Sequence, residues 1–249
     1  MCVYINQRTY YINQNLPAMF RSLVFYTLLS LWTIFLGLIC LPLLFFPSRY
    51  LNKPIRIWIK MIFLLLKFIC HITHEIQGFE NIPSHAVIIA SKHQSAFETL
   101  ALFYYIPRAI FIHKKQLFLI PIFGQYLKKI NMISIDRAGR ASTMRNMLKL
   151  ARGKILSGIS IIIFPEGTRK NPGSKPNYKT GFVGLYKELN TEILPIAVNS
   201  GKFWPKNTIV KKAGHITIKI LPLIKSGLDR KKILSEVQEK IEDASNKLA

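Results

Sequence analysis

The chain has 249 residues, of which 35 are Lys or Arg and 12 are Asp or Glu, so its formal net charge is +23. Half of its residues are hydrophobic, which excludes a disordered basic tail because such tails lack the apolar side chains that build a core. The length allows one catalytic domain with an appendage, or two small domains. The charge favours anionic partners: a lipid surface, a phosphorylated metabolite, an acidic protein or a nucleic acid.

The first part of the chain is apolar and nearly uncharged. Arg8 and Arg21 are the only charged residues before position 49, and the run from Ser22 to Phe46 carries no charge. A helix of this length could cross a hydrocarbon core of about 30 Å. A cleaved signal peptide fits poorly, because the run is long and no small-residue cleavage site follows it. Pro42 and Pro47 leave open a helix that enters one leaflet and turns back.

A second apolar segment, from Lys53 to Cys70, is interrupted by basic residues. On a helix they would form one narrow cationic stripe: Lys53, Arg56, Lys60 and Lys67. Such a helix could lie in the membrane interface with its stripe toward anionic headgroups. Alternatively, it could pack in the core of the domain and leave its basic face in solvent.

The position of these basic residues predicts an orientation. They follow the apolar run directly, so the positive-inside rule places the chain from Arg49 onward on the cytoplasmic side of the inner membrane. We therefore predict N-terminal membrane-anchoring helices over residues 1–72 and a second domain over residues 73–249.

The cysteines and histidines favour neither a disulfide framework nor a metal site. Cys2, Cys40 and Cys70 are few and irregularly spaced. His71 and His74 lie three residues apart, but no third ligand is close in the sequence. We expect no metal and no cofactor.

From residue 75 onward, short β-branched runs alternate with helical patterns. Strands are predicted over residues 86–90, 109–112, 130–135, 159–164, 193–198 and 216–221. Helices are predicted over residues 95–105, 140–156, 181–189 and 229–247. This alternation indicates an α/β fold with a mixed, largely parallel sheet flanked by helices. In such sheets the chemistry gathers beyond the carboxyl ends of the strands.

A histidine and a carboxylate follow the first of these strands. Ser95 and Glu98 have the spacing of a capping box, which would start a helix at Ser95 and leave His93 in the preceding turn. The Glu98 side chain would then point back toward the helix start and could reach an imidazole nitrogen. The other nitrogen of His93 would be free to take a proton from a substrate hydroxyl. The alternative is that Glu98 only caps the helix and His93 is a surface residue.

The strand over residues 159–164 leads into a tight polar turn, Pro165–Arg169. Its glycine allows the backbone to approach a ligand closely, and Arg169 could hold a phosphate through two hydrogen bonds. Three lysines follow in a loop rich in Pro, Gly and Asn: Lys170, Lys175 and Lys179. By itself, the turn is as consistent with a plain β-turn as with an anion site.

These segments together resemble the glycerolipid acyltransferase family, which is marked by four ordered blocks. His93–Glu98 is similar to the first block, although Glu98 stands where the family usually has Asp. Phe164–Arg169 is the third block without a change. The second block is similar to three segments, Lys114–Leu117, Phe123–Gly124 and Ile135–Arg137. The fourth block is similar to Ile193–Gly201.

The resemblance implies an activity and a set of site residues. The activity is transfer of a fatty acyl group from an acyl thioester to the sn-2 hydroxyl of 1-acyl-sn-glycerol-3-phosphate, giving phosphatidic acid in phospholipid biosynthesis. His93 would be the general base and Glu98 would orient it. The resemblance also implies two binding sites. The substrate phosphate site would be formed by Arg169, Gly167, Glu166, Arg137 and Lys114. Pro195 would line the acyl or acceptor pocket.

The same resemblance implies the partners. They are a membrane lipid substrate, an anionic membrane surface, and either acyl-CoA or acyl-acyl carrier protein as co-substrate. Nucleic acid is not expected, because no nucleic-acid-binding module is visible. Two alternatives stay open: the acceptor could be another lysophospholipid or a lyso-ornithine lipid, or Glu98 could mark a catalytically inactive lipid-binding homologue.

Overall fold

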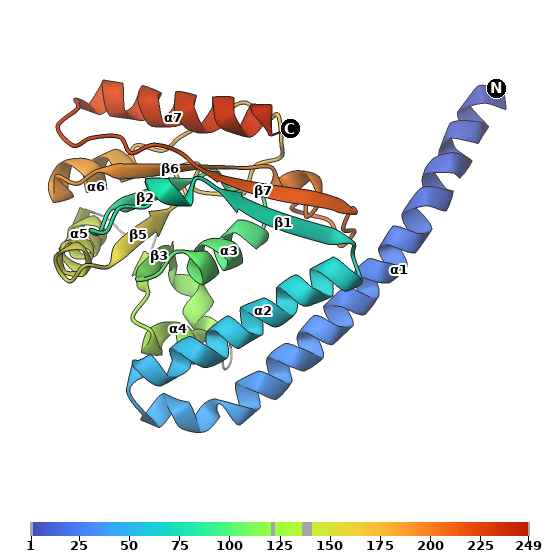
Figure 1. Cartoon of the computed structure of the whole chain (residues 1–249), viewed down its shortest axis with the longest axis horizontal. Helices are drawn as coiled ribbons and strands as arrows, with labels where there is room; N and C mark the ends of the chain where they lie inside the picture. Colours follow the sequence, from blue (N-terminus) through green and yellow to red (C-terminus); the bar gives the residue numbers. More distant parts are fainter. Residues whose placement is uncertain (1, 121–122, 136–140, 249) are drawn as a thin grey trace.

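The computed structural model describes residues 2–120, 123–135 and 141–248. A seven-stranded sheet forms the centre of the molecule (Figure 1). Its strands are β1 (Ile72–Gln77), β2 (Ile88–Ser91), β3 (Ala109–Lys114), β4 (Ile133–Ile135), β5 (Ser160–Ile163), β6 (Ile193–Val198) and β7 (Gly214–Ile220). Their order is β1-β7-β6-β2-β5-β3-β4, and all neighbours are parallel except β6 and β7. The predicted mixed, largely parallel sheet is confirmed.

Helices cover both faces of the sheet. They are α1 (Cys2–Ile39), α2 (Asn52–Phe68), α3 (Phe97–Tyr105), α4 (Phe123–Lys129), α5 (Ala141–Leu156), α6 (Gly181–Leu189) and α7 (Arg230–Lys247). Short 3-10 segments are η1 (Leu41–Phe45), η2 (Ser48–Leu51), η3 (Phe79–Asn81), η4 (Lys115–Leu119) and η5 (Ser200–Lys202). Apolar side chains of α2 and α3 pack in one core cluster, and those of α5, α6 and α7 pack in the other. The sheet therefore separates two hydrophobic cores.

Helix α1 extends well beyond the domain (Figure 1). It ends at Ile39, so the apolar run over residues 22–46 is not one continuous helix. Pro42 explains this end, because proline disfavours a helical conformation at the residue before it and cannot donate a helical hydrogen bond. In the described part of the chain, Pro17–Ile39 is the one helical stretch long and apolar enough to cross a membrane, and only 11% of it is buried.

Helix α2 packs in the core of the domain. Four apolar side chains on one of its faces are buried: Ile59, Ile62, Phe63 and Leu66. The four cations of the predicted stripe are all exposed: Lys53, Arg56, Lys60 and Lys67. The buried face agrees with the alternative in which this segment packs in the core of the domain, and contact of the exposed face with a membrane stays a prediction. The domain boundary between residues 72 and 73 stays a prediction, and it falls at the start of β1.

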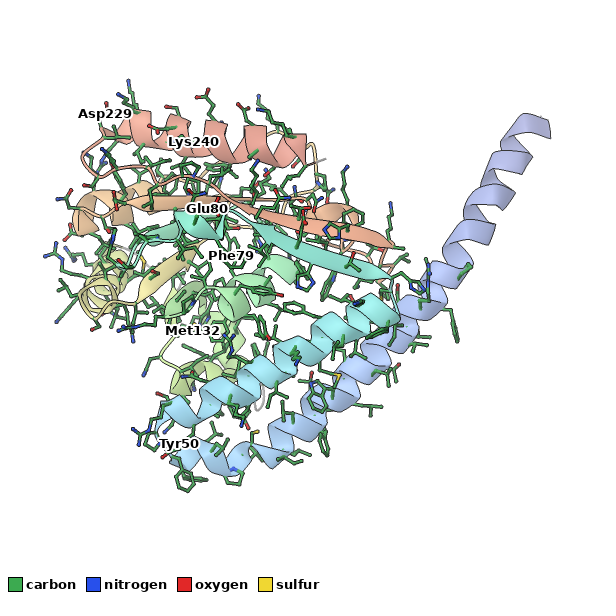
Figure 2. The ribbon with its side chains drawn as sticks, in the orientation of Figure 1. Tyr50, Phe79, Glu80, Met132, Asp229 and Lys240 are labelled. Carbon is green, nitrogen blue, oxygen red and sulfur yellow. The ribbon has the colours of Figure 1, made fainter. Side chains whose placement is uncertain are left out.

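Helices α1 and α2 form a hairpin that is attached to the sheet domain. Figure 2 shows Tyr50 at the tip of this hairpin. Further along α1, the Ser22 hydroxyl accepts a hydrogen bond from the main-chain N–H of Lys211 at 2.8 Å. The ring of Phe25 packs edge-on against Trp204, with the ring centroids 5.6 Å apart. These contacts fix the middle of α1 against the domain.

Gly78 ends strand β1 in a conformation that favours glycine. Its φ is +81°, and an added Cβ would overlap the main-chain oxygen of Ile220 in β7. We expect Gly78→Ala to lower the free energy of unfolding by about 2 kcal/mol or more. Gly184→Ala, in α6, is the matched control, because no atom lies within 4 Å of its added Cβ. Denaturant melts of both variants in detergent measure the difference, and equal midpoints would contradict this expectation.

Candidate active site

The carboxyl ends of three central strands meet at one edge of the sheet. Strand β2 is parallel to both β5 and β6, so the segments that follow β2 and β5 emerge side by side. A hydrogen bond joins these two segments directly: the main-chain N–H of Lys170 donates to the main-chain oxygen of His93 at 2.8 Å. The two polar segments singled out in the sequence therefore form one site.

His93 and Glu98 are in contact within this site. The Nδ1 atom of His93 lies 2.9 Å from Oε1 of Glu98. The same carboxylate oxygen accepts hydrogen bonds from the main-chain N–H groups of Gln94 and Ser95, each at 2.7 Å. The Ser95 hydroxyl in turn accepts one from Phe97 N at 2.8 Å. The carboxylate thus folds back over the helix start as the capping box predicts, although α3 begins at Phe97 rather than at Ser95.

Glu98 is fully buried, and its charge is compensated by donors. Its second oxygen, Oε2, accepts a hydrogen bond from the Ser200 hydroxyl at 2.7 Å. Burial raises the pKa of Glu98, but the hydrogen bond and charge of His93, together with the donors Ser200 and Ser95, outweigh burial and lower this pKa below its ordinary value. The carboxylate is therefore ionised near neutral pH.

The imidazole of His93 is held on its face as well as its edge. It stacks on the ring of Phe164 with the centroids 3.9 Å apart and the planes at 14°. An ionised carboxylate can only accept, so Nδ1 of His93 carries the proton of their hydrogen bond, and Nε2 is left as the acceptor nitrogen of the neutral ring. The side chain is 17% exposed, which gives a substrate access to it. This arrangement suits a general base.

The turn after β5 presents a free guanidinium. Gly167 has a φ of +69°, and its main-chain N–H donates to the Phe164 oxygen at 2.9 Å, which closes the turn. Thr168 and Arg169 follow it and are exposed. No hydrogen bond or ion pair within the described residues occupies the Arg169 side chain, so it is available to an anionic ligand.

Glu166 lies in the same turn, but its carboxylate faces the interior. Oε2 accepts a hydrogen bond from the main-chain N–H of His93 at 2.9 Å, and Oε1 lies 3.0 Å from Nζ of Lys92. Burial raises the pKa of Glu166, and the Lys92 ammonium partly offsets this. The Glu166 carboxylate thus holds the turn against His93, and it does not share the solvent-facing side with Arg169.

The structure places the remaining predicted site residues as follows. Pro195 is buried within β6, where it is paired with Ala90 of β2. It does not line the apolar cavity between the α1–α2 hairpin and the sheet domain, which is described below. Lys114 ends β3, and its side chain lies outside the described residues, as does all of Arg137. The roles of these residues stay predictions.

An apolar cavity of about 310 Å³ lies between the N-terminal hairpin and the sheet domain. Phe111 lines it and stacks on Phe164, with the centroids 5.8 Å apart, and Phe164 stacks on His93. The rings of Phe111 and Phe164 therefore lie between the cavity and the imidazole. The wall combines residues of α1, α2, α3 and α4, among them Gly37, Ile55, Leu100 and Tyr126.

Comparison with known proteins decides the family. Residues 73–199 match the family model described as Acyltransferase. The chain is also 30% identical, over 225 residues, to a 1-acyl-sn-glycerol-3-phosphate acyltransferase of Pseudomonas aeruginosa, and the match covers 89% of this chain and 87% of that protein. The chain belongs to the acyltransferase family. Its membership confirms the resemblance that the four sequence blocks indicated.

Further relatives carry the same name. A 1-acyl-sn-glycerol-3-phosphate acyltransferase of Limnanthes alba is 28% identical over 211 residues, or 84% of this acyltransferase and 74% of the relative. The human 1-acyl-sn-glycerol-3-phosphate acyltransferase alpha is 26% identical over 194 residues, a match that covers 77% of this chain and 68% of the human protein. The crystal structure of the 1-acyl-sn-glycerophosphate acyltransferase PlsC from Thermotoga maritima superposes with a TM-score of 0.77 at 24% identity, covering 94% of this chain and 96% of that one. The two share a fold.

Several residues of the acyltransferase site were missed by sequence reasoning. Ser200 lies in the fourth sequence block, just after a buried strand, where a polar residue often indicates a functional site. Of that block, only Pro195 was predicted as a site residue. Lys92 directly precedes His93, and a lysine that interrupts a buried run was a usable signal. Glu242 lies in α7, in an amphipathic helix whose polar residues look alike in the sequence, so no signal could have found it.

Ser200 provides a test of how Glu98 is held. We expect Ser200→Ala to lower kcat by about 10- to 100-fold, because a lost hydrogen bond to a buried charge costs about 1.5–3 kcal/mol. The substitution removes a donor that lowers the Glu98 pKa, so the acid limb of the kcat profile should move to higher pH. Ser200→Thr keeps the hydroxyl and should retain activity. Ser235→Ala, on the exposed face of α7, is the control, and a Ser200→Ala profile identical to it would contradict the expectation.

Proposed function

We propose that this acyltransferase transfers a fatty acyl group from an acyl thioester to the sn-2 hydroxyl of 1-acyl-sn-glycerol-3-phosphate, giving phosphatidic acid. The observation that carries the proposal is the His93–Glu98 pair hydrogen-bonded to the turn that presents Arg169. It combines a general base with a cation for the phosphate of the acceptor. The relatives named for this reaction support the choice of acceptor.

The reaction follows from the geometry of the imidazole. Nε2 of His93 takes the proton from the sn-2 hydroxyl as its oxygen attacks the thioester carbonyl carbon. The tetrahedral intermediate expels the thiolate, which receives the proton from the imidazolium. Glu98 stabilises the imidazolium through its hydrogen bond to Nδ1 and keeps the ring in the required tautomer. The acceptor oxygen is itself the nucleophile, so the acyl group passes directly to the lipid.

The acceptor phosphate would bind at the turn after β5. Arg169 offers two parallel N–H groups, and Gly167 lets the backbone approach the phosphate closely. Arg137 and Lys114 would add positive charge. The loop that follows supplies a cationic rim, because two of its lysines, Lys175 and Lys179, are exposed and the third, Lys170, is partly so.

The acyl chain of the donor would occupy the apolar cavity. Its wall is almost entirely hydrocarbon, and Phe111 and Phe164 lead from it to His93. Each methylene moved from water into such a site stabilises binding by about 0.8 kcal/mol. The thioester would then lie near the imidazole. The donor itself would be acyl-CoA or acyl-acyl carrier protein, each of which joins an apolar chain to an anionic carrier.

The N-terminal helix would hold the enzyme at its substrate. Lysophosphatidic acid leaves a bilayer reluctantly, since each buried methylene contributes about 0.8 kcal/mol. Helix α1 exposes a column of large apolar side chains: Met19, Phe20, Leu23, Leu31, Ile34, Phe35, Leu38 and Ile39. With the basic residues that follow α1, this arrangement supports a site at the cytoplasmic face of the inner membrane.

The proposed roles of His93 and Arg169 are separable by kinetics. We expect His93→Ala to lower kcat by about 10²–10⁴-fold, the range that a general base contributes. Arg169→Met should instead raise KM for lysophosphatidic acid, because it removes binding to the phosphate. The measurement is acyl transfer by purified protein in detergent, with both donor classes and a panel of lysolipids. Turnover of an acceptor without a phosphate and none of lysophosphatidic acid would contradict the proposed acceptor.

The acyl cavity predicts a chain-length effect. Leu100→Trp places a larger side chain in its wall, so we expect activity with long-chain donors to fall more than activity with short-chain donors. Leu150→Trp is the matched control, because Leu150 is exposed on α5, away from the cavity. Competition between donors of different chain length measures the ratio. An unchanged ratio in Leu100→Trp would mean that the chain binds elsewhere.

A further inference from the structure

A buried cluster of charged and polar side chains lies directly behind the active site. The Lys92 ammonium donates a hydrogen bond to Oε1 of Glu242 at 2.6 Å and lies 3.0 Å from Oε1 of Glu166. The Tyr178 hydroxyl donates to the same Glu242 oxygen at 3.0 Å. We call these four residues the Lys92 cluster. They come from the end of β2, the turn after β5, the loop before α6, and α7.

The cluster contains more negative than positive charge. Lys92 is 3% exposed, and the side chains of Glu166 and Glu242 are 0% and 14% exposed, so one ammonium serves two carboxylates away from solvent. Buried charges are tolerated only when they are paired. The Tyr178 hydroxyl relieves part of the excess at Glu242, and the Lys92 ammonium lowers the pKa of Glu166 against the effect of burial.

The cluster reaches the catalytic histidine through Glu166. Oε2 of Glu166 accepts the main-chain N–H of His93 at 2.9 Å, and the main-chain oxygen of His93 accepts Lys170 N at 2.8 Å. The backbone of His93 is thus held on both sides by the turn that carries Arg169. The distance between the imidazole and a phosphate bound at Arg169 therefore depends on how Glu166 is held.

Substrate binding is a poor explanation for Lys92. Its ammonium lies between two protein carboxylates and is almost inaccessible, so it offers no free donor to a headgroup. Lys92 and His93 are consecutive, but their side chains have different neighbours. The lysine contacts α7, and the imidazole stacks on Phe164. The charge of Lys92 acts within the protein.

We propose that Lys92 and Glu242 are positioning residues for the acyl transfer, through which the C-terminal helix α7 holds Glu166 and, through Glu166, the backbone of His93. The proposal rests on the proposed function only in that acyl transfer to lysophosphatidic acid is the reaction whose rate is measured. It makes α7, which lies beyond the 73–199 match to the family model, a working part of the catalytic site.

The proposal has a pH signature. Glu166 contacts Lys92 and the His93 N–H directly, and the Glu242 carboxylate and the Tyr178 hydroxyl lie beyond the Lys92 ammonium, close enough to interact electrostatically with Glu166. Without the ammonium, burial and the Glu242 charge would keep Glu166 protonated over more of the pH range, which weakens its acceptance of the His93 N–H. The acid limb of kcat should then move to higher pH.

The first experiment compares Lys92→Met with Lys240→Met in kcat, KM and pH profile. Lys240 is the matched control because it lies on α7, is 39% exposed and pairs with Glu236 (Figure 2). We expect Lys92→Met to lower kcat about tenfold, with KM for the acceptor nearly unchanged. Adding Glu166→Gln should recover activity and restore the acid limb, because an amide oxygen accepts the His93 N–H at any pH. A raised KM with intact kcat, or behaviour like Lys240→Met, would overturn the proposal.

A double-mutant cycle tests the part played by α7. We expect Glu242→Gln to lower kcat in the wild-type background, because Lys92 loses its partner in α7. Beside Lys92→Met it should cause no further loss and should recover part of kcat, because it removes the carboxylate charge that raises the pKa of Glu166. Additive effects would overturn the relay. Should Lys92→Met fail to fold, Glu242→Gln and Tyr178→Phe probe the relay from its far end: a lower kcat at constant KM supports it, and unchanged kinetics contradict it.

Hydrogen exchange separates this proposal from the proposed function. The His93 main-chain N–H should exchange faster in Lys92→Met than in Lys240→Met, whatever the enzyme's acceptor is, and equal rates would overturn the proposal. Failure of the wild type to acylate lysophosphatidic acid would contradict the proposed function alone. The exchange measurement would still decide the role of Lys92.

Discussion

Glu98 keeps a negative charge in the interior of the domain, and the structure around it is arranged to hold that charge. Its two oxygens receive hydrogen bonds from His93 Nδ1, Gln94 N, Ser95 N and Ser200 Oγ. These donors follow β2 or β6, so the carboxylate is satisfied only when the two strands are in register, with Ser91 paired to Ile196. The same register sets the position of the imidazole. Catalytic geometry and sheet pairing thus depend on one buried carboxylate.

The site lies between two environments that suit different parts of its substrates. On one side, the α1–α2 hairpin, α3 and α4 line an apolar cavity, and the stacked rings of Phe111 and Phe164 lie between this cavity and the imidazole. On the other, Arg169 and the lysines of the following loop face solvent. In the proposed function, the acyl chain would occupy the apolar side and the phosphate the cationic side, which would bring the thioester and the sn-2 hydroxyl together at His93.

Local patterns predicted much of this arrangement, and contacts between distant segments account for what they missed. Strand β6 and helix α6 have their predicted bounds, and the capping box placed Glu98 beside His93. Strand β1 was missed because it lies at the sheet edge and its polar residues hide the alternation of a strand. The partners of Lys92 lie far away in the sequence, and what the apolar face of α2 packs against depends on the rest of the domain. Neither follows from periodicity.

Helix α1 is connected to Glu98 by a short series of contacts. The Lys211 ammonium lies over the rings of Tyr26 and Trp204, at 4.0 and 4.8 Å from their centroids. Burial lowers the pKa of Lys211 to about 8, so the ammonium is still mostly charged at neutral pH and can make cation–π contacts with these rings. Trp204 N donates to the main-chain oxygen of Ser200, whose hydroxyl binds Glu98. The orientation of α1 is therefore fixed relative to His93 and Glu98, so in the proposed membrane location the depth of α1 would set the depth of the site.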